Sequence, residues 1–164
     1  MQHHSYQSTP SFLNNFFGTF NYTRQEALKQ GILMDVTAQA KRFNFSGAVA
    51  ISQTLFDQCV KWDRFDTECQ IYQNQDSRLS SLLTVARAAI RISGVAATEA
   101  SFVLTVLPKD GYSLKKTPKR LRIVLDKGDQ NQPVLTIMMA DDLHQALLDF
   151  TRTAQENLNE GCYD

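Results

Sequence analysis

The stretch SRLSSLLTVARAAIRISG, residues 77–94, carries the most regular helical pattern of the chain. Its apolar residues recur at the i, i+3, i+4 and i+7 spacing that brings them onto one face of an α-helix. Gly94 is expected to end this helix, and Arg87 and Arg91 are expected on its solvated flank. The stretch therefore predicts a central amphipathic helix, with an apolar face formed by Leu79, Leu82, Leu83, Ala86 and Ile90.

Three strand-like segments follow this helix. They are SFVLTVLP (101–108), LRIVLD (121–126) and PVLTIMMA (133–140), and the second alternates apolar and polar residues with period 2. Gly128 and Pro133 favour a turn before the third segment. The three segments predict an antiparallel meander.

The residues before the central helix contain shorter elements. Thr23 and Glu26 have the spacing of a capping box, and Gly31 favours a helix end, so a helix is predicted over 24–30. An extended segment over 32–36, a buried strand over 46–52 and a helix capped by Ser52 are expected next. Residues 63–76 show no clean period and are interpreted as a long loop.

The end of the chain predicts one more helix. The stretch ADDLHQALLDFTRTAQENLNEG, residues 140–161, has an apolar stripe and two aspartates at its start, where the helix dipole favours acids. We therefore expect an α+β fold with one domain over residues 12–164 and a flexible leader over 1–11. Its sheet should be antiparallel with three strands or slightly more, its helices on one sheet face, and its C-terminal helix long.

Composition narrows the class of protein. The chain has 164 residues, with 17 basic and 17 acidic residues, so its formal net charge is zero. This balance argues against a polyanionic DNA mimic. Three cysteines without metal-type spacing suit a reducing compartment, and neither a membrane span nor a secretion signal is present in the sequence. A cytoplasmic location without membrane association is expected.

Signatures of catalysis are absent from the sequence. It has no Gly-rich phosphate loop, HExxH, GxSxG or paired CxxC motif. His144 lies close to Asp141 and Asp142, but helix capping is the favoured role for these acids. Cys59 is expected in the core. We therefore expect no catalytic residue, no metal and no cofactor, while a small enzyme of another class remains an alternative.

Two groups of residues favour binding to a partner. The segment PKDGYSLKKTPKRLR, residues 108–122, is strongly basic, and as a long hairpin it would form a mobile arm with Tyr112 near its tip. For the segment taken by itself, a solvated loop balanced by the acidic C-terminal helix is the favoured interpretation. An aromatic cluster near the N-terminus could supply apolar anchors, and Arg24 has no evident local partner. The predicted contact residues are Lys109, Tyr112, Lys115, Lys116, Lys119, Arg120, Phe16, Phe17, Phe20 and Arg24.

The pattern Y-T-R-x-x-A-x-x-x-G-[VI]-L-x-D-V, matched over residues 22–36, resembles the opening signature of a bacterial family of unknown function carried on plasmids and in phages. Later segments up to Asp142 are similar in order. This resemblance implies an accessory protein of a mobile element that inhibits a host defence complex, such as a CRISPR effector. The pattern is matched by Tyr22, Thr23, Arg24, Ala27, Gly31, Ile32, Leu33, Asp35 and Val36.

The function expected from the sequence is therefore that of a small non-enzymatic binding protein. Its partner would be a protein, including a protein within a nucleoprotein complex. An accessory or regulatory protein that binds nucleic acid is the alternative, although zero net charge and the lack of a recognition-helix motif weigh against it.

Overall fold

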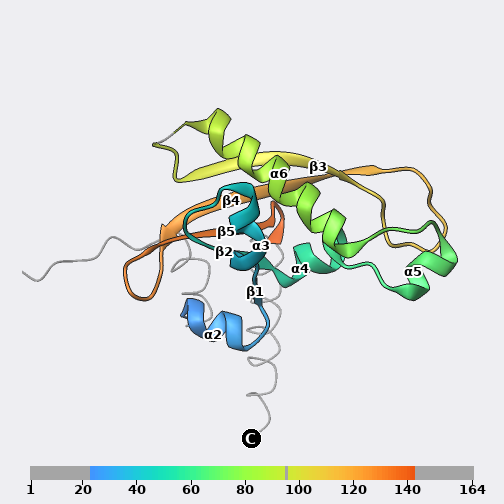
Figure 1. Ribbon diagram of the computed structural model, residues 1–164, viewed down its shortest axis with the longest axis horizontal. Helices are drawn as coiled ribbons and strands as arrows, with labels where there is room; N and C mark the ends of the chain where they lie inside the picture. Colours follow the sequence, from blue (N-terminus) through green and yellow to red (C-terminus); the bar gives the residue numbers. More distant parts are fainter. Residues whose placement is uncertain (1–22, 95, 143–164) are drawn as a thin grey trace, which may run out of the picture.

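A computed structural model describes residues 23–94 and 96–142, and a single sheet organises them (Figure 1). The helices are α2 (Arg24–Lys29), α3 (Thr37–Ala40), α4 (Gln53–Leu55), α5 (Arg64–Cys69) and α6 (Gln75–Ser93), with a 3-10 turn η1 (Lys41–Phe43) and a π-helical turn η2 (Phe56–Val60). The strands are β1 (Leu33–Asp35), β2 (Ala48–Ser52), β3 (Glu99–Val106), β4 (Thr117–Lys127) and β5 (Pro133–Met139).

The sheet has five strands in the order β1-β2-β5-β4-β3. The predicted antiparallel meander of β3, β4 and β5 is confirmed. The prediction of a purely antiparallel sheet is wrong, because β2 pairs in parallel with β5, with Ala48 opposite Val134. The apolar run of β2 is buried over most of its length, which is typical of a strand with neighbours on both sides.

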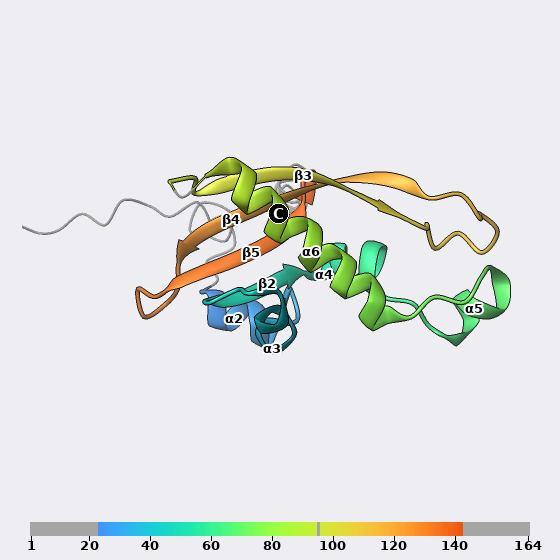
Figure 2. The ribbon, with the colours of Figure 1, turned by 45° about the horizontal axis from the view of Figure 1, so that its top comes forward.

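One face of the sheet packs against α6 and forms the main core (Figure 2). The predicted central helix is confirmed, and Asn74 caps its start by accepting a hydrogen bond from the Ser77 amide. Because side chains alternate along a strand, Ile51, Ile123 and Ile137 meet the helix together. The predicted apolar face is also confirmed, since Leu79, Leu82, Leu83 and Ala86 belong to this core and Ile90 packs against it.

The opposite face is covered by α2, so the prediction that all helices lie on one face is wrong. Ala27 of α2 joins a second apolar cluster with Ala50, Val124 and Met138. These strand residues alternate with the residues that face α6, and their apolar side chains also need cover. The predicted capping box of Thr23 and Glu26 begins α2.

Residues 63–76 were predicted to be one long loop, and this prediction is wrong for residues 64–69 and 75–76. Helix α5 occupies part of the segment and begins with a capping box in which Asp63 and Asp66 each accept the other's backbone N–H. The helix shows no apolar stripe because Phe65 is exposed and Asp66 is buried. Local capping chemistry therefore specifies α5 where hydrophobic periodicity does not.

The predicted leader, the aromatic cluster with Phe16, Phe17 and Phe20, and most of the predicted C-terminal helix lie outside the described residues. The described residues contain no helix that combines the length and the apolar character needed to span a membrane.

Candidate functional site

The connection between β3 and β4, residues 107–116, is the predicted basic hairpin, and it lies beside α5 at one end of the molecule (Figures 1 and 2). A mobile arm was one of the two interpretations of the sequence. The structure instead shows a connection that is braced by contacts with α5 and with Gln70, the residue directly after α5.

Lys109 provides the first of these contacts. Its Nζ atom lies 2.9 Å from the Asp66 carboxylate, and both side chains are largely buried. Burial acts to raise the pKa of Asp66, but hydrogen bonding by Asp63 and the Lys109 ammonium outweighs it, so the pKa lies below its ordinary value. Lys109 is thus engaged within the chain and is not part of a free basic surface.

Gln70, directly after α5, provides the second contact. Its side-chain Nε2 donates to the carbonyl oxygens of Pro108 and Ser113, at 3.0 and 2.5 Å. The same atom lies 3.3 Å from Oδ1 of Asp110. The amide group of Gln70 therefore holds both ends of the loop from Pro108 to Ser113 against the segment between α5 and α6.

Large apolar side chains are concentrated at this end. Of the eight large hydrophobic residues that are exposed in the described part of the chain, five lie in α5, in the segment after it or in the β3–β4 connection. These side chains do not contribute to the core, because they are exposed. A group of exposed apolar side chains in one region of the surface often marks a site of interaction with another molecule. The most exposed of the five are Phe65 (71%), Tyr72 (75%), Tyr112 (78%) and Leu114 (67%).

Basic residues border these side chains. Lys115 and Lys116 are exposed and form no ion pair within the part of the chain that the structure describes. By contrast, the Asp110 carboxylate accepts hydrogen bonds from the Ser113 hydroxyl and from the Tyr112 and Ser113 amides. Hydrogen bonding by Ser113 is the main cause that lowers the pKa of Asp110.

The other acids at this end are also engaged, with Asp66 bound to Lys109 and Glu68 to Arg64. Among the described residues of α5 and the β3–β4 connection, the charge that is left without an ion pair or a hydrogen bond is therefore positive and lies on Lys115 and Lys116. Phe65, Tyr72, Tyr112, Leu114, Lys115 and Lys116 are called the hairpin-end surface below.

Lys119 and Arg120, also predicted as contact residues, lie further along β4. The Nζ atom of Lys119 donates to the side chain of Gln58 at 3.2 Å, and Arg120 is exposed. They extend the basic character beyond the hairpin end. Sequence reasoning missed Phe65 and Tyr72, because they fall in a segment that was interpreted as a loop. It also missed Leu114, whose exposure only the structure shows.

Arg24 had no evident local partner in the sequence and was predicted to lie at a contact surface. This expectation is wrong, because Arg24 is partly buried and forms hydrogen bonds within the chain. Its Nη1 atom donates to the Thr136 hydroxyl at 2.7 Å, and its side chain is partly buried beneath the sheet face that α2 covers. Thr136 is fully buried, and the guanidinium of Arg24 provides its hydroxyl with a hydrogen bond. Arg24 therefore has a structural role in docking α2.

Two described groups that could take part in catalysis, the Cys59 thiol and the Asp142 carboxyl group, have structural roles. Cys59 is fully buried, as predicted, and burial raises the pKa of its thiol. Asp142 accepts hydrogen bonds from the Ser52 hydroxyl and the Met139 amide, while His144 lies outside the described residues. No group of three or more metal-ligating side chains occurs within residues 23–94 and 96–142.

Comparison of the chain with protein families, with characterised proteins and with solved structures finds no match. The resemblance to the plasmid and phage family stays a prediction, and the site must be interpreted from its own geometry.

Proposed function

We propose that this protein is a non-enzymatic binding protein that recognises an acidic protein partner through the hairpin-end surface. The observation that carries this proposal is the concentration of exposed Phe65, Tyr72, Tyr112 and Leu114 beside lysines that form no ion pair with any residue in 23–94 or 96–142. Tyrosine and other aromatic side chains provide much of the binding energy in protein interfaces.

The bracing of this end supports the same proposal. The contacts of Lys109 and Gln70 hold the β3–β4 connection against α5 before any partner arrives. Less conformational entropy is then lost when Tyr112 and Leu114 are immobilised in a complex. A braced surface is better suited to binding than the mobile arm that the sequence predicted.

Charge determines the kind of partner. Lys115 and Lys116 are available, whereas Asp110, Asp66 and Glu68 are neutralised or hydrogen-bonded within the chain. Positive potential beside apolar anchors accelerates association with an acidic surface and disfavours basic ones. Lys119 and Arg120 on β4 would extend this complementarity over a wider area.

The resemblance adds a direction to this proposal. It suggests that the partner belongs to a host defence complex, with a CRISPR effector as the first candidate to test, and that binding inhibits the complex. Phe16, Phe17 and Phe20 would add apolar contacts, as the sequence predicts. The expected place of action is the cytoplasm.

The experiment is affinity capture of partners from host lysate by the full chain, with and without nuclease, followed by mass spectrometry. We expect protein capture that survives nuclease and is lost when Lys115, Lys116 and Lys119 are all replaced by Glu. A matched control replaces three exposed cations elsewhere, Lys29 of α2 and Lys41 and Arg42 of η1, by Glu and should retain capture.

A second pair of variants tests the apolar component. Tyr112→Ala should weaken binding of the captured protein by about tenfold or more, as expected for an interface hot spot. Ile92→Ala removes an apolar side chain that is even more exposed, at the far end of α6, and should have no effect. Capture that depends on nucleic acid, or that is unchanged in the lysine variant, would refute the proposal.

A further inference from the structure

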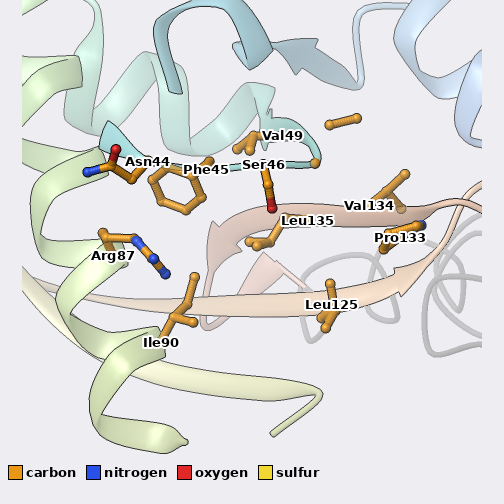
Figure 3. Close-up of a pocket in the computed structure, with 12 residues that line it drawn as sticks. Asn44, Phe45, Ser46, Val49, Arg87, Ile90, Leu125, Pro133, Val134 and Leu135 are labelled. Atoms are coloured by element: carbon orange, nitrogen blue, oxygen red, sulfur yellow. The ribbon is translucent and has the colours of Figure 1, made fainter. Parts of the chain in front are cut away.

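A pocket lies between the C-terminal half of α6, residues 44–47 and the strands β4 and β5 (Figure 3). Its volume is about 210 Å³, and most of its lining is apolar. The pocket is formed far from the hairpin end, at the opposite end of β4 and of α6. A ligand here would therefore be a second function, separate from the proposed protein contact.

The pocket exists because the sheet extends past the helix that covers it. Helix α6 ends at Gly94, whose amide donates to the Ile90 carbonyl, while β4 continues to Lys127. Leu125 and Leu135, on the sheet face that packs against α6, are left incompletely covered. A smaller cavity of about 40 Å³ shares Ile90, Leu125 and Leu135, so the apolar floor continues toward the start of β3.

Arg87 supplies charge to this apolar site. Figure 3 shows its side chain extending from α6 toward the pocket, above Ile90 and facing Phe45. Its guanidinium carbon lies 5.9 Å from the centroid of the Phe45 ring. Arg87 is the one charged residue among the described residues that line the pocket, and no described carboxylate pairs with it.

This arrangement favours a ligand with two parts. An apolar body would replace water over Leu125 and Leu135, and burial of apolar surface would drive its binding. A guanidinium held against an aromatic ring binds a planar carboxylate through paired hydrogen bonds. A single cation balances a single negative charge, so a carboxylate fits this pocket better than a phosphate dianion.

We propose that the pocket binds a small carboxylate with an apolar body, such as a medium-chain fatty acid, with its carboxylate on Arg87 and its chain over Leu125 and Leu135. The pocket is smaller than a typical site for a drug-sized molecule, which is about 300 Å³ or more, and this limits the length of the apolar body.

The test is a titration of the isotope-labelled full chain with octanoate, followed through the backbone amide resonances. Octanoate should shift the resonances around Ile90, Leu125 and Leu135 saturably. Octanol, which lacks the charge, and acetate, which lacks the apolar body, should each bind at least about tenfold more weakly, because each loses one of the two contributions. Equal binding of octanol and octanoate, or no shifts at these residues, would overturn the proposal.

Variants of α6 identify the carboxylate contact. Arg87→Met keeps the aliphatic part of the side chain and should weaken octanoate binding by about tenfold or more, with little change for octanol. Arg87→Lys keeps the charge without the planar fork and should give an intermediate affinity. Arg91→Met, one turn further on the exposed flank, is the matched control and should bind like the parent chain. Unchanged octanoate affinity in both Arg87 variants would refute the assignment.

Discussion

The guanidinium carbon of Arg78 lies 4.7 Å from the centroid of the Trp62 ring, and both residues are only 6% exposed. Arg78 also donates from Nε to the Cys59 carbonyl at 3.0 Å and from Nη2 to the Leu107 carbonyl at 3.2 Å. Burial lowers the pKa of Arg78, but an arginine keeps its proton at neutral pH. A buried cation thus joins η2, α6 and the start of the β3–β4 connection.

Replacing Arg78 by Met should lower the free energy of unfolding by about 2–4 kcal/mol, because two buried carbonyl groups lose their hydrogen-bond donor. Urea denaturation measures this loss. Adding Trp62→Leu completes a double-mutant cycle, in which a coupling energy of about 1–2 kcal/mol is expected for a desolvated cation–π contact. Strictly additive effects would show that the ring contact contributes nothing.

The ion pair of Lys109 and Asp66 should make the hairpin end sensitive to acid. Because the pKa of Asp66 is lowered in the folded state, its stabilising contribution is present above the ordinary aspartate pKa and is lost as the pH falls through the folded value. Lys109→Met should raise the pKa of Asp66, measured by NMR titration of its carboxyl group. The same variant should lower the free energy of unfolding by about 1–2 kcal/mol at neutral pH.

The control for this pair is Arg64→Met. Arg64 and Glu68 also form an ion pair, but their side chains are 92% and 58% exposed. Such a surface pair contributes about 0–0.5 kcal/mol. An equal loss of stability in the Arg64 and Lys109 variants would contradict the assigned bracing role of Lys109.

Gln70 should position the hairpin end without touching the partner. In Gln70→Ala, the carbonyls of Pro108 and Ser113 lose a common donor, so amide hydrogen exchange over residues 107–116 should accelerate. Partner affinity should fall as a result, although the contact side chains are unchanged. Gln39→Ala, an exposed substitution in α3, is the matched control and should change neither measurement.

Arg24 and Thr136 should be coupled in docking α2. Arg24→Met leaves the buried hydroxyl of Thr136 without this donor and should cost about 1–2 kcal/mol. The pair Arg24→Met with Thr136→Val should cost less than the sum of the single changes, because both polar groups are removed together. Lys29→Met, at the exposed end of α2, is the control in the same denaturation series.

Asp142 should have the opposite pH behaviour to Asp66. Burial raises its pKa above the ordinary value, despite the hydrogen bond donated by Ser52. The folded state therefore holds this proton more tightly than the unfolded chain, and stability is lost as the pH rises through the interval between the two values.

Asp142→Asn removes this titration while keeping a side-chain acceptor. As the pH rises from about 3 to about 7, the free energy of unfolding of the variant should increase relative to that of the parent chain. Thermal unfolding at the two pH values checks the sign. Asp141→Asn, next to it and exposed, should show a much smaller difference, because the Asp141 charge is the least of the causes that raise the pKa of Asp142. A parent chain that is relatively more stable at the higher pH would contradict the raised pKa.

The elements that the sequence predicted well are those specified by neighbours in the chain. Helix α2 follows from its capping box and from Gly31, which has a φ of 73°, and α6 follows from its apolar period. The meander follows from alternation and turn residues in the same way. These signals act within a few residues, so a single sequence contains them in full.

Relationships across long distances in the sequence were not predictable in the same way. Nothing near Arg24 indicates Thr136 as its partner. The apolar run of β2 indicates a buried strand, but it does not identify β5 as the parallel neighbour. Part of the hairpin-end surface was predicted, and part was not, because its residues come from segments that are distant in the sequence. Tyr112, Lys115 and Lys116 lie in one basic segment, whereas Phe65 and Tyr72 approach it through folding alone.

The pairing of Ala48 with Val134 also sets an order of assembly during synthesis. When β2 leaves the ribosome, the strand that it must join has not yet been made. Helix α6 and the β3–β4–β5 meander depend on neighbouring segments and can form first, and local contacts form faster than distant ones. The unit of α2, β1 and β2 must then wait for β5, and until β5 is made the apolar strand β2 lacks its neighbour on that edge.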